Sequence, residues 1–213
     1  MTSATIGNGQ VFRLEVPPPA ISGRMVLRLQ GYRDVAAVRP KIAEIAERMA
    51  QQASTLAAPE VVVWRGPLEE VGTNSVGVAG QTFNSPTLAR LLADASEIQA
   101  VLLSVGSGIE DQSHEMLTEG KSVEALFMDT CGWAAISLSV RVIRRLLEEQ
   151  AEARSMRLTT RLAPGYRDWP LEEQAAIFEL FGDAPLPASL NESAAMTPKK
   201  SLTAVFGCRG ILS

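Results

Sequence analysis

The residues with the most potential for chemistry lie in one ten-residue segment, RLAPGYRDWP, which begins at Arg161. Arg161 can hold a carboxylate through two parallel hydrogen bonds, because its planar guanidinium matches two oxygens at once. Pro164 and Gly165 suit the central positions of a type II turn, in which glycine supplies a positive φ. The turn would bring the main chain of Ala163 towards the ligand of Arg161, and Tyr166 could present its ring and hydroxyl. An amino acid moiety suits this arrangement, but so does a surface turn in which Arg161 pairs with an acid.

A second segment, LNESAAMTPKKS from Leu190, precedes the last predicted strand. Glu192 could complement Arg161 or accept a hydrogen bond from a ligand ammonium, and Ser193 stands beside it. Lys199 and Lys200 are expected to be solvated, as most lysines are. By itself this segment is also compatible with a purely structural role.

Composition excludes several classes of function. The net charge is -4 and the basic residues are scattered along the chain, so nucleic acid is not an expected partner. Cys131, Cys208 and the single histidine, His114, form no metal-ligand spacing, and a structural zinc site needs about four such ligands. We therefore predict no metal site. One histidine also argues against a serine or cysteine hydrolase, which needs a histidine beside its nucleophile.

The same composition predicts a soluble, cytoplasmic protein. No apolar run in the sequence approaches the ~20 residues needed to cross a bilayer. The N-terminal segment MTSATIGNG lacks the basic start and the apolar core of a signal peptide.

The helices and strands expected around the two segments indicate one α+β domain. In this domain a mixed or antiparallel sheet packs on a long central helix. Helical patterns begin at Lys41, Thr87, Ile109, Ser122 and Leu171, and that from Ser122 to about Glu152 is apolar nearly all round in its first half. Residues 1–23 are predicted to form an extended N-terminal segment, and residues 24–213 the domain. Strands are expected at Met25–Leu29, Val61–Trp64, Val76–Phe83 (an edge strand with a bulge), Ala100–Val105 and Ser201–Phe206.

Three features follow one another in this chain: Arg-x-x-Pro-Gly-Tyr, a helix led by Trp-Pro, and Glu-Ser-x-x-Met-x-Pro-x-x-Ser before a closing strand. With these features in this order, the chain resembles the activation domain of cobalamin-dependent methionine synthase. It is more similar still to stand-alone relatives found beside corrinoid methyltransferases. The close similarity covers residues 157–207. The upstream half resembles those relatives in its general order of elements.

The resemblance implies a protein that binds S-adenosylmethionine and docks against a cobalamin-carrying partner whose cobalt has drifted to the inactive cob(II) state. One electron from a reductase, flavodoxin-like or iron-sulfur, with methyl transfer from S-adenosylmethionine, then restores methylcobalamin. The chain would be a subunit or activator of the methionine synthase or another corrinoid methyltransferase. By position, Arg161 would hold the methionyl carboxylate and Ala163 would contact the ligand through its backbone. Tyr166 would face the corrin or the reacting methyl, and Glu192 and Ser193 would line the same pocket.

The chain departs from this family at one position. Members often carry an acid on the long helix, and Ser137 is the best placement of that position here. The nearest upstream acid is Asp129, two turns away. The chain also lacks the Asp-x-His-x-x-Gly signature of a corrinoid carrier, so cobalamin is expected to arrive on a partner.

Two other functions are compatible with the sequence. Ala100–Val105 followed by Gly106 and Gly108 resembles the opening of a nucleotide-binding βαβ unit, with Asp129 about twenty residues on. That pattern favours a Rossmann-type methyltransferase, although Asp111 stands where the third glycine belongs. The serine at Ser137 favours instead a non-catalytic subunit that docks on a corrinoid protein.

Overall fold

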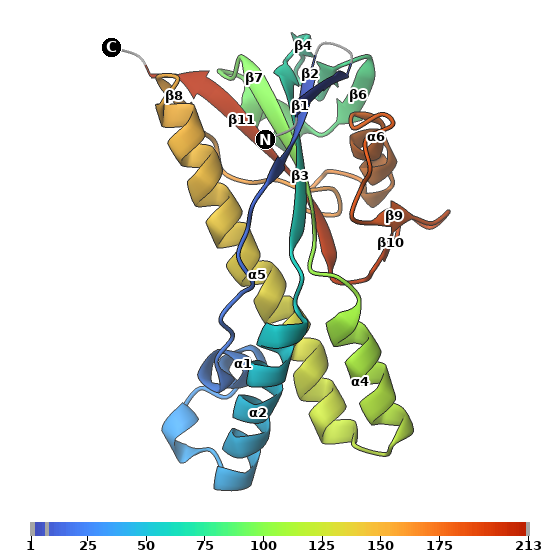
Figure 1. The fold of residues 1–213 in the computed structure, drawn as a ribbon. Helices are drawn as coiled ribbons and strands as arrows, with labels where there is room; N and C mark the ends of the chain where they lie inside the picture. The colour runs from blue at the N-terminus through green and yellow to red at the C-terminus, as the bar shows by residue number, and fades with distance from the viewer. Residues whose placement is uncertain (1–2, 7–8, 212–213) are drawn as a thin grey trace.

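The structure is a computed structural model that describes residues 3–6 and 9–211 (Figure 1). Every strand pair in these ranges is antiparallel. The main sheet has the order β1-β2-β3-β7-β11-β8, and β4-β5-β6 and β9-β10 form two small sheets. The strands are β1 (Ser3–Ile6), β2 (Gly9–Leu14), β3 (Glu60–Pro67), β4 (Glu70–Val71), β5 (Ser75–Val78), β6 (Gln81–Asn84), β7 (Glu97–Ser104), β8 (Met156–Leu158), β9 (Ser189–Leu190), β10 (Met196–Thr197) and β11 (Ser201–Gly210).

Helices cover this sheet and extend beyond it. The α-helices and 3-10 turns are α1 (Gly23–Leu29), η1 (Val35–Ala37), α2 (Pro40–Leu56), α3 (Pro86–Leu92), α4 (Gly108–Thr118), α5 (Ser122–Glu152), η2 (Leu171–Glu173) and α6 (Gln174–Glu179). The predicted α+β architecture, an antiparallel sheet with a long helix, is confirmed.

The main sheet is buried on both faces, and each face has its own core. Side chains alternate across a strand, so in β3 Val61 and Val63 join one apolar cluster while Val62 and Trp64 join the other. The first cluster packs the sheet against α5, α1 and α2. The second packs it against α3, α6 and the small sheet of β5 and β6. The site loop described below belongs to this second side.

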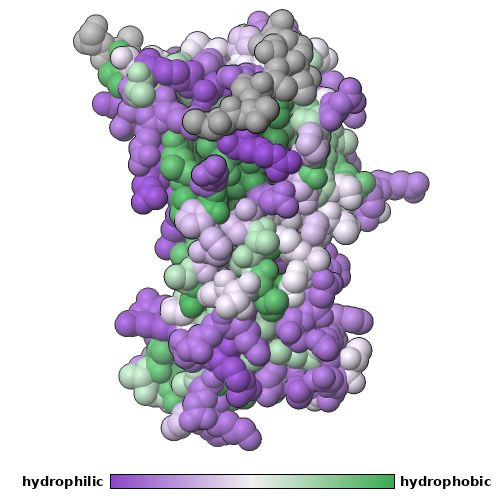
Figure 2. All heavy atoms as spheres, viewed as in Figure 1, coloured by the Kyte–Doolittle hydropathy of each residue, from purple (hydrophilic) through white to green (hydrophobic). Residues whose placement is uncertain are grey.

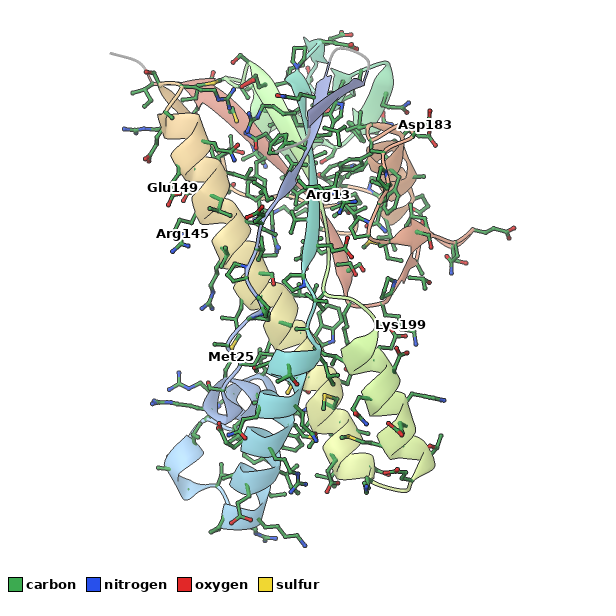
Figure 3. The ribbon with its side chains drawn as sticks, viewed as in Figure 1. Arg13, Met25, Arg145, Glu149, Asp183 and Lys199 are labelled. Carbon is green, nitrogen blue, oxygen red and sulfur yellow. The ribbon has the colours of Figure 1, made fainter. Side chains whose placement is uncertain are left out.

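Helix α5 connects the sheet to a helical lobe. In Figure 1 its first half lies among α1, α2 and α4, and its last turns reach the sheet beside β8. By length and composition alone, α5 is apolar enough to cross a membrane, which the sequence analysis did not expect of any segment. Half of its most apolar window is buried inside the protein, so packing accounts for this composition. Arg145 and Glu149 mark its outer face (Figure 3), with 3.8 Å between Nε and Oε1.

Two predicted strands are wrong. Met25–Leu29 lies in helix α1, because the Ser22 side chain caps the helix by accepting from the Met25 backbone N–H, and the adjacent Val26 and Leu27 fill the core. The segment from Val76 to Phe83 is a hairpin of β5 and β6. Ala79 and Gly80, both with positive φ, form its turn and place the glycine between strands instead of in a bulge.

The N-terminal segment contributes to the sheet. Residues 9–14, part of the segment 1–23 that the sequence sets apart, form β2 and pair with β3. On the face seen in Figure 2, apolar residues are visible at the surface in the upper half of the molecule. Hydrophilic residues dominate the helical end.

Candidate functional site

The predicted turn at Pro164 and Gly165 is present. The Tyr166 N–H donates to the Ala163 carbonyl at 3.2 Å, and Gly165 has a φ of 83°. A four-residue turn with proline second and a positive-φ glycine third is a type II turn. Ala163 and Pro164 are buried, whereas Tyr166 is 55% exposed. The main chain is thus fixed while the aromatic side chain stays available to a ligand or partner.

Trp169 anchors the end of this loop. Its indole is buried, meets the Phe83 ring edge-on at 5.7 Å between centroids, and donates from Nε1 to Glu173 at 2.8 Å. Glu173 in turn accepts from the backbone N–H of Asn84. The Trp-Pro pair that opens the predicted helix therefore fastens the loop to β6.

Asp168 fastens the same loop to α3. Its carboxylate accepts from the hydroxyls of Ser85 and Thr87 and from the Thr87 backbone N–H. These donors hold the pKa of Asp168 below its ordinary value, first through the Ser85 hydroxyl and then through that of Thr87.

Arg161 lies between two attachments to the edge of β11. Leu162 exchanges both backbone hydrogen bonds with Val205, and the Thr159 N–H donates to the Gly207 carbonyl. Arg161 itself is partly exposed, and in the described part of the chain its guanidinium has no hydrogen bond or ion pair. The alternative in which this arginine pairs with an acid is therefore not what the structure shows.

Arg161 borders a cavity of about 610 Å3 between α3 and the edge of β11. None of the residues that line it is acidic. The lining consists of Thr87, Arg90, Leu91, Thr159, Thr160, Arg161, Leu162, Arg167 and Arg209. We call this cavity the arginine pocket. Sequence reasoning missed Arg90 and Arg209, which carry no local signal because only the fold brings them to Arg161.

Glu192 and Ser193 lie elsewhere. They occupy the exposed turn of the β9-β10 hairpin, which projects from the molecule in Figure 1. The turn is shaped by the Asn191 side chain, which accepts from the Ser193 N–H, and tied down by Gln174, which donates to the Ala194 carbonyl. Neither residue lines the arginine pocket. Their contact with a ligand stays a prediction.

A second polar cluster joins the start of β11 to α5. The Lys200 ammonium lies 2.8 Å from the Asp129 carboxylate and 4.5 Å from the centre of the Trp133 ring. Its aliphatic stem runs over Gly132, where a Cβ would come within 2.7 Å of it. One expectation is wrong here, because Lys200 is buried instead of solvated. Trp133, whose ring faces the Lys200 ammonium, is itself 51% exposed.

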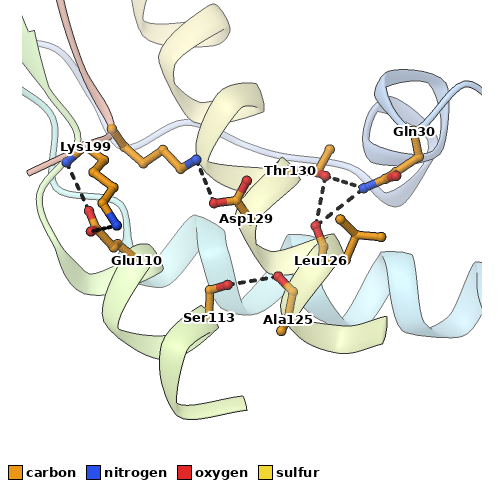
Figure 4. A network of polar contacts seen from close by, with 9 residues as sticks. Gln30, Glu110, Ser113, Ala125, Leu126, Asp129, Thr130 and Lys199 are labelled. Atoms are coloured by element: carbon orange, nitrogen blue, oxygen red, sulfur yellow. Dashed lines mark hydrogen bonds and ion pairs between the residues drawn. The ribbon is translucent and has the colours of Figure 1, made fainter. Parts of the chain in front are cut away.

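The helices around this cluster are joined by further hydrogen bonds (Figure 4). Ser113 of α4 donates to the Ala125 carbonyl at 2.9 Å, and the Gln30 amide beside α1 donates to Thr130. Cys131 lies in the core, and burial raises the pKa of its thiol to about 12. Burial therefore disfavours the thiolate, which is the reactive form of cysteine.

The long helix presents no acid in place of Ser137. Ser137 is exposed, and its hydroxyl donates to the Trp133 carbonyl of the preceding turn. Asp129 is engaged by Lys200. The nucleotide-binding hypothesis also fails, because β7 pairs only with antiparallel strands among the described residues, whereas a βαβ unit needs a parallel pair. Gly106, with a φ of 78°, shapes the turn after β7 instead.

A solved structure shares this architecture. The crystal structure of the MetH reactivation domain bound to AdoHcy is similar to the chain with a TM-score of 0.61 and 16% sequence identity. The similarity covers 96% of this chain and 79% of that one. No protein-family model and no curated protein matches the sequence. The chain therefore has the fold of that reactivation domain, in agreement with the resemblance of its motifs.

Proposed function

We propose that this protein binds S-adenosylmethionine and supports the reductive remethylation of cobalamin on a methionine synthase or another corrinoid methyltransferase. The observation that carries the proposal is the unpaired guanidinium of Arg161 beside a type II turn, in a fold like that of a domain bound to AdoHcy. The ligand carboxylate would occupy the two parallel donors of Arg161. The main chain at Ala163 would border the amino acid end.

The chain would contribute positioning and the cofactor would contribute the reaction. Cobalamin, carried by a partner, would accept the methyl group after one electron from a flavodoxin-like or iron-sulfur reductase. The exposed ring of Tyr166 is available to face that partner. Because both cysteines, Cys131 and Cys208, are free and buried, we also place the protein in a reducing compartment, the cytoplasm.

The absence of an acid at Ser137 favours a second function, a docking subunit that binds the corrinoid protein without S-adenosylmethionine. A ligand ammonium at this helix would meet a serine hydroxyl instead of a carboxylate, and Asp129 is already paired. The two functions differ in whether the isolated chain binds the nucleoside.

Calorimetric titration with S-adenosylmethionine and with AdoHcy tests the proposal. Arg161→Ala should weaken both ligands by about tenfold to a hundredfold, because a charge-assisted hydrogen bond contributes about 1.5–3 kcal/mol. Arg24→Ala is the matched control, since Arg24 is an exposed arginine on α1, in the helical lobe. Equal affinity in wild type and Arg161→Ala would contradict the assignment. No binding by the wild type, with retained association to a corrinoid protein, would establish the docking function.

A further inference from the structure

The arginine pocket concentrates positive charge in a protein of net charge -4. Its four arginines come from four places in the chain: Arg90 from α3, Arg161 from the edge of β11, Arg167 from the loop after the turn, and Arg209 from the end of β11. No acid is among the lining residues. Such convergence is a property of the fold, since no pair of these residues is adjacent in sequence.

These guanidinium groups have no anionic partner within the described chain. Arg90 makes one long contact, 3.5 Å to the Thr87 hydroxyl, and the side chains of Arg167 and Arg209 make none. Elsewhere in the molecule arginines do pair with acids, as Arg154 does with Glu97. Four like charges around one cavity repel one another, and an anion in the cavity would relieve that repulsion.

The backbone holds part of this array in place. Arg167 has a φ of 58°, in the left-handed region that residues other than glycine rarely adopt. The chain that follows Arg167 is fixed by the hydrogen bonds of Asp168 to α3 and by the burial of Trp169. Arg209 lies in register with Arg157 across the β11-β8 pair. The arginines therefore extend from fixed backbone on both sides of the cavity.

We propose that the arginine pocket binds a small molecule that carries one or more phosphate groups. A carboxylate has two oxygens and matches one guanidinium fork, whereas a phosphate group accepts hydrogen bonds from several forks at once. S-adenosylmethionine bears one carboxylate, one ammonium and one sulfonium, so it would leave Arg90, Arg167 and Arg209 uncompensated. This site goes beyond the proposed function and shares only Arg161 with it.

Inorganic pyrophosphate is the probe, titrated calorimetrically into the whole protein in a phosphate-free buffer of low ionic strength. Wild type should bind it saturably, and Arg90→Ala and Arg209→Ala should each lower the affinity about tenfold, the loss of one charge-assisted contact. Arg24→Ala should bind as wild type does, because α1 lies in the helical lobe, at the other end of the molecule from β8 and the end of β11 (Figure 1). Thermal unfolding of each variant checks that the fold is retained.

Three results would overturn this site. They are the absence of saturable pyrophosphate binding, an equal loss in Arg24→Ala, and binding of the tricarboxylate citrate as tight as that of pyrophosphate. The same variants distinguish the phosphate site from the S-adenosylmethionine site. Arg209→Ala should keep the wild-type affinity for S-adenosylmethionine while losing pyrophosphate. If the wild type binds pyrophosphate but not S-adenosylmethionine, the proposed function is refuted and this site is supported.

Discussion

Replacing Asp129 should destabilise the protein more than replacing Lys200, although the two side chains form one ion pair. The pair is asymmetric in exposure, because the Lys200 side chain is 5% exposed and that of Asp129 is 51% exposed. If its partner is removed, a half-exposed carboxylate regains water, whereas a buried ammonium does not.

The expected magnitudes follow from that difference. Stranding a fully buried charge costs about 3–5 kcal/mol. In Asp129→Ala the Trp133 ring would still face the Lys200 ammonium, and a cation–π contact retains about 1–2 kcal/mol. We therefore expect Asp129→Ala to lower the free energy of unfolding by about 2–3 kcal/mol. Lys200→Met keeps an unbranched stem over Gly132 and removes a charge that must otherwise be buried. It should therefore lower the free energy of unfolding only by what an exposed ion pair contributes, about 0–1 kcal/mol.

Urea unfolding of the single and double variants measures these free energies. The double variant should be close to Lys200→Met alone, because Asp129 has no buried charge left to compensate. Lys199→Met is the matched control, since the Lys199 side chain is 80% exposed in its own ion pair with Glu110. It should change stability by less than about 0.5 kcal/mol. A larger loss in Lys200→Met than in Asp129→Ala would refute the reasoning, because burial would then not decide which partner is costly to strand.

The site loop could be predicted from sequence because its chemistry is local. Proline and glycine at the centre of a turn restrict φ by their own covalent structure, so Pro164 and Gly165 specify a type II turn in any surroundings. The long helix could likewise be predicted, from a continuous helical pattern that is apolar nearly all round in its first half. The free guanidinium of Arg161 could not, because whether an acid lies opposite it depends on segments far away in the chain.

Lys200 and Trp133 show the limit of residue-type reasoning. Lysine is usually solvated and tryptophan usually buried, yet here the tryptophan ring covers the lysine and is itself half exposed. Gly132 makes this inversion possible by leaving room for the lysine stem.

In α1, the alternation of Met25–Leu29 is too short to separate a strand from a helix, and the Ser22 cap and the core contacts decide for the helix.

Two further predictions concern the loop. Gly165→Ala should lower the free energy of unfolding by about 1–2 kcal/mol, because φ is 83° there and a Cβ is strained in that region. Gly210→Ala, where a Cβ would meet no atom within 4 Å, is the control in the same urea series, and an equal loss in both would contradict this reason. The second prediction is a pH dependence from Asp168. Hydroxyl donors from Ser85 and Thr87 hold its pKa below the ordinary value of 3.8. A carboxyl whose pKa is lower in the folded than in the unfolded state stabilises the fold fully above the unfolded value. This stabilisation is lost as the pH falls through the folded value. Wild type should therefore lose thermal stability more steeply below about pH 4 than Asp168→Asn, whose amide does not titrate. Parallel stability curves for the two proteins across this range would show that the loop's attachment to α3 does not depend on the charge of the carboxylate.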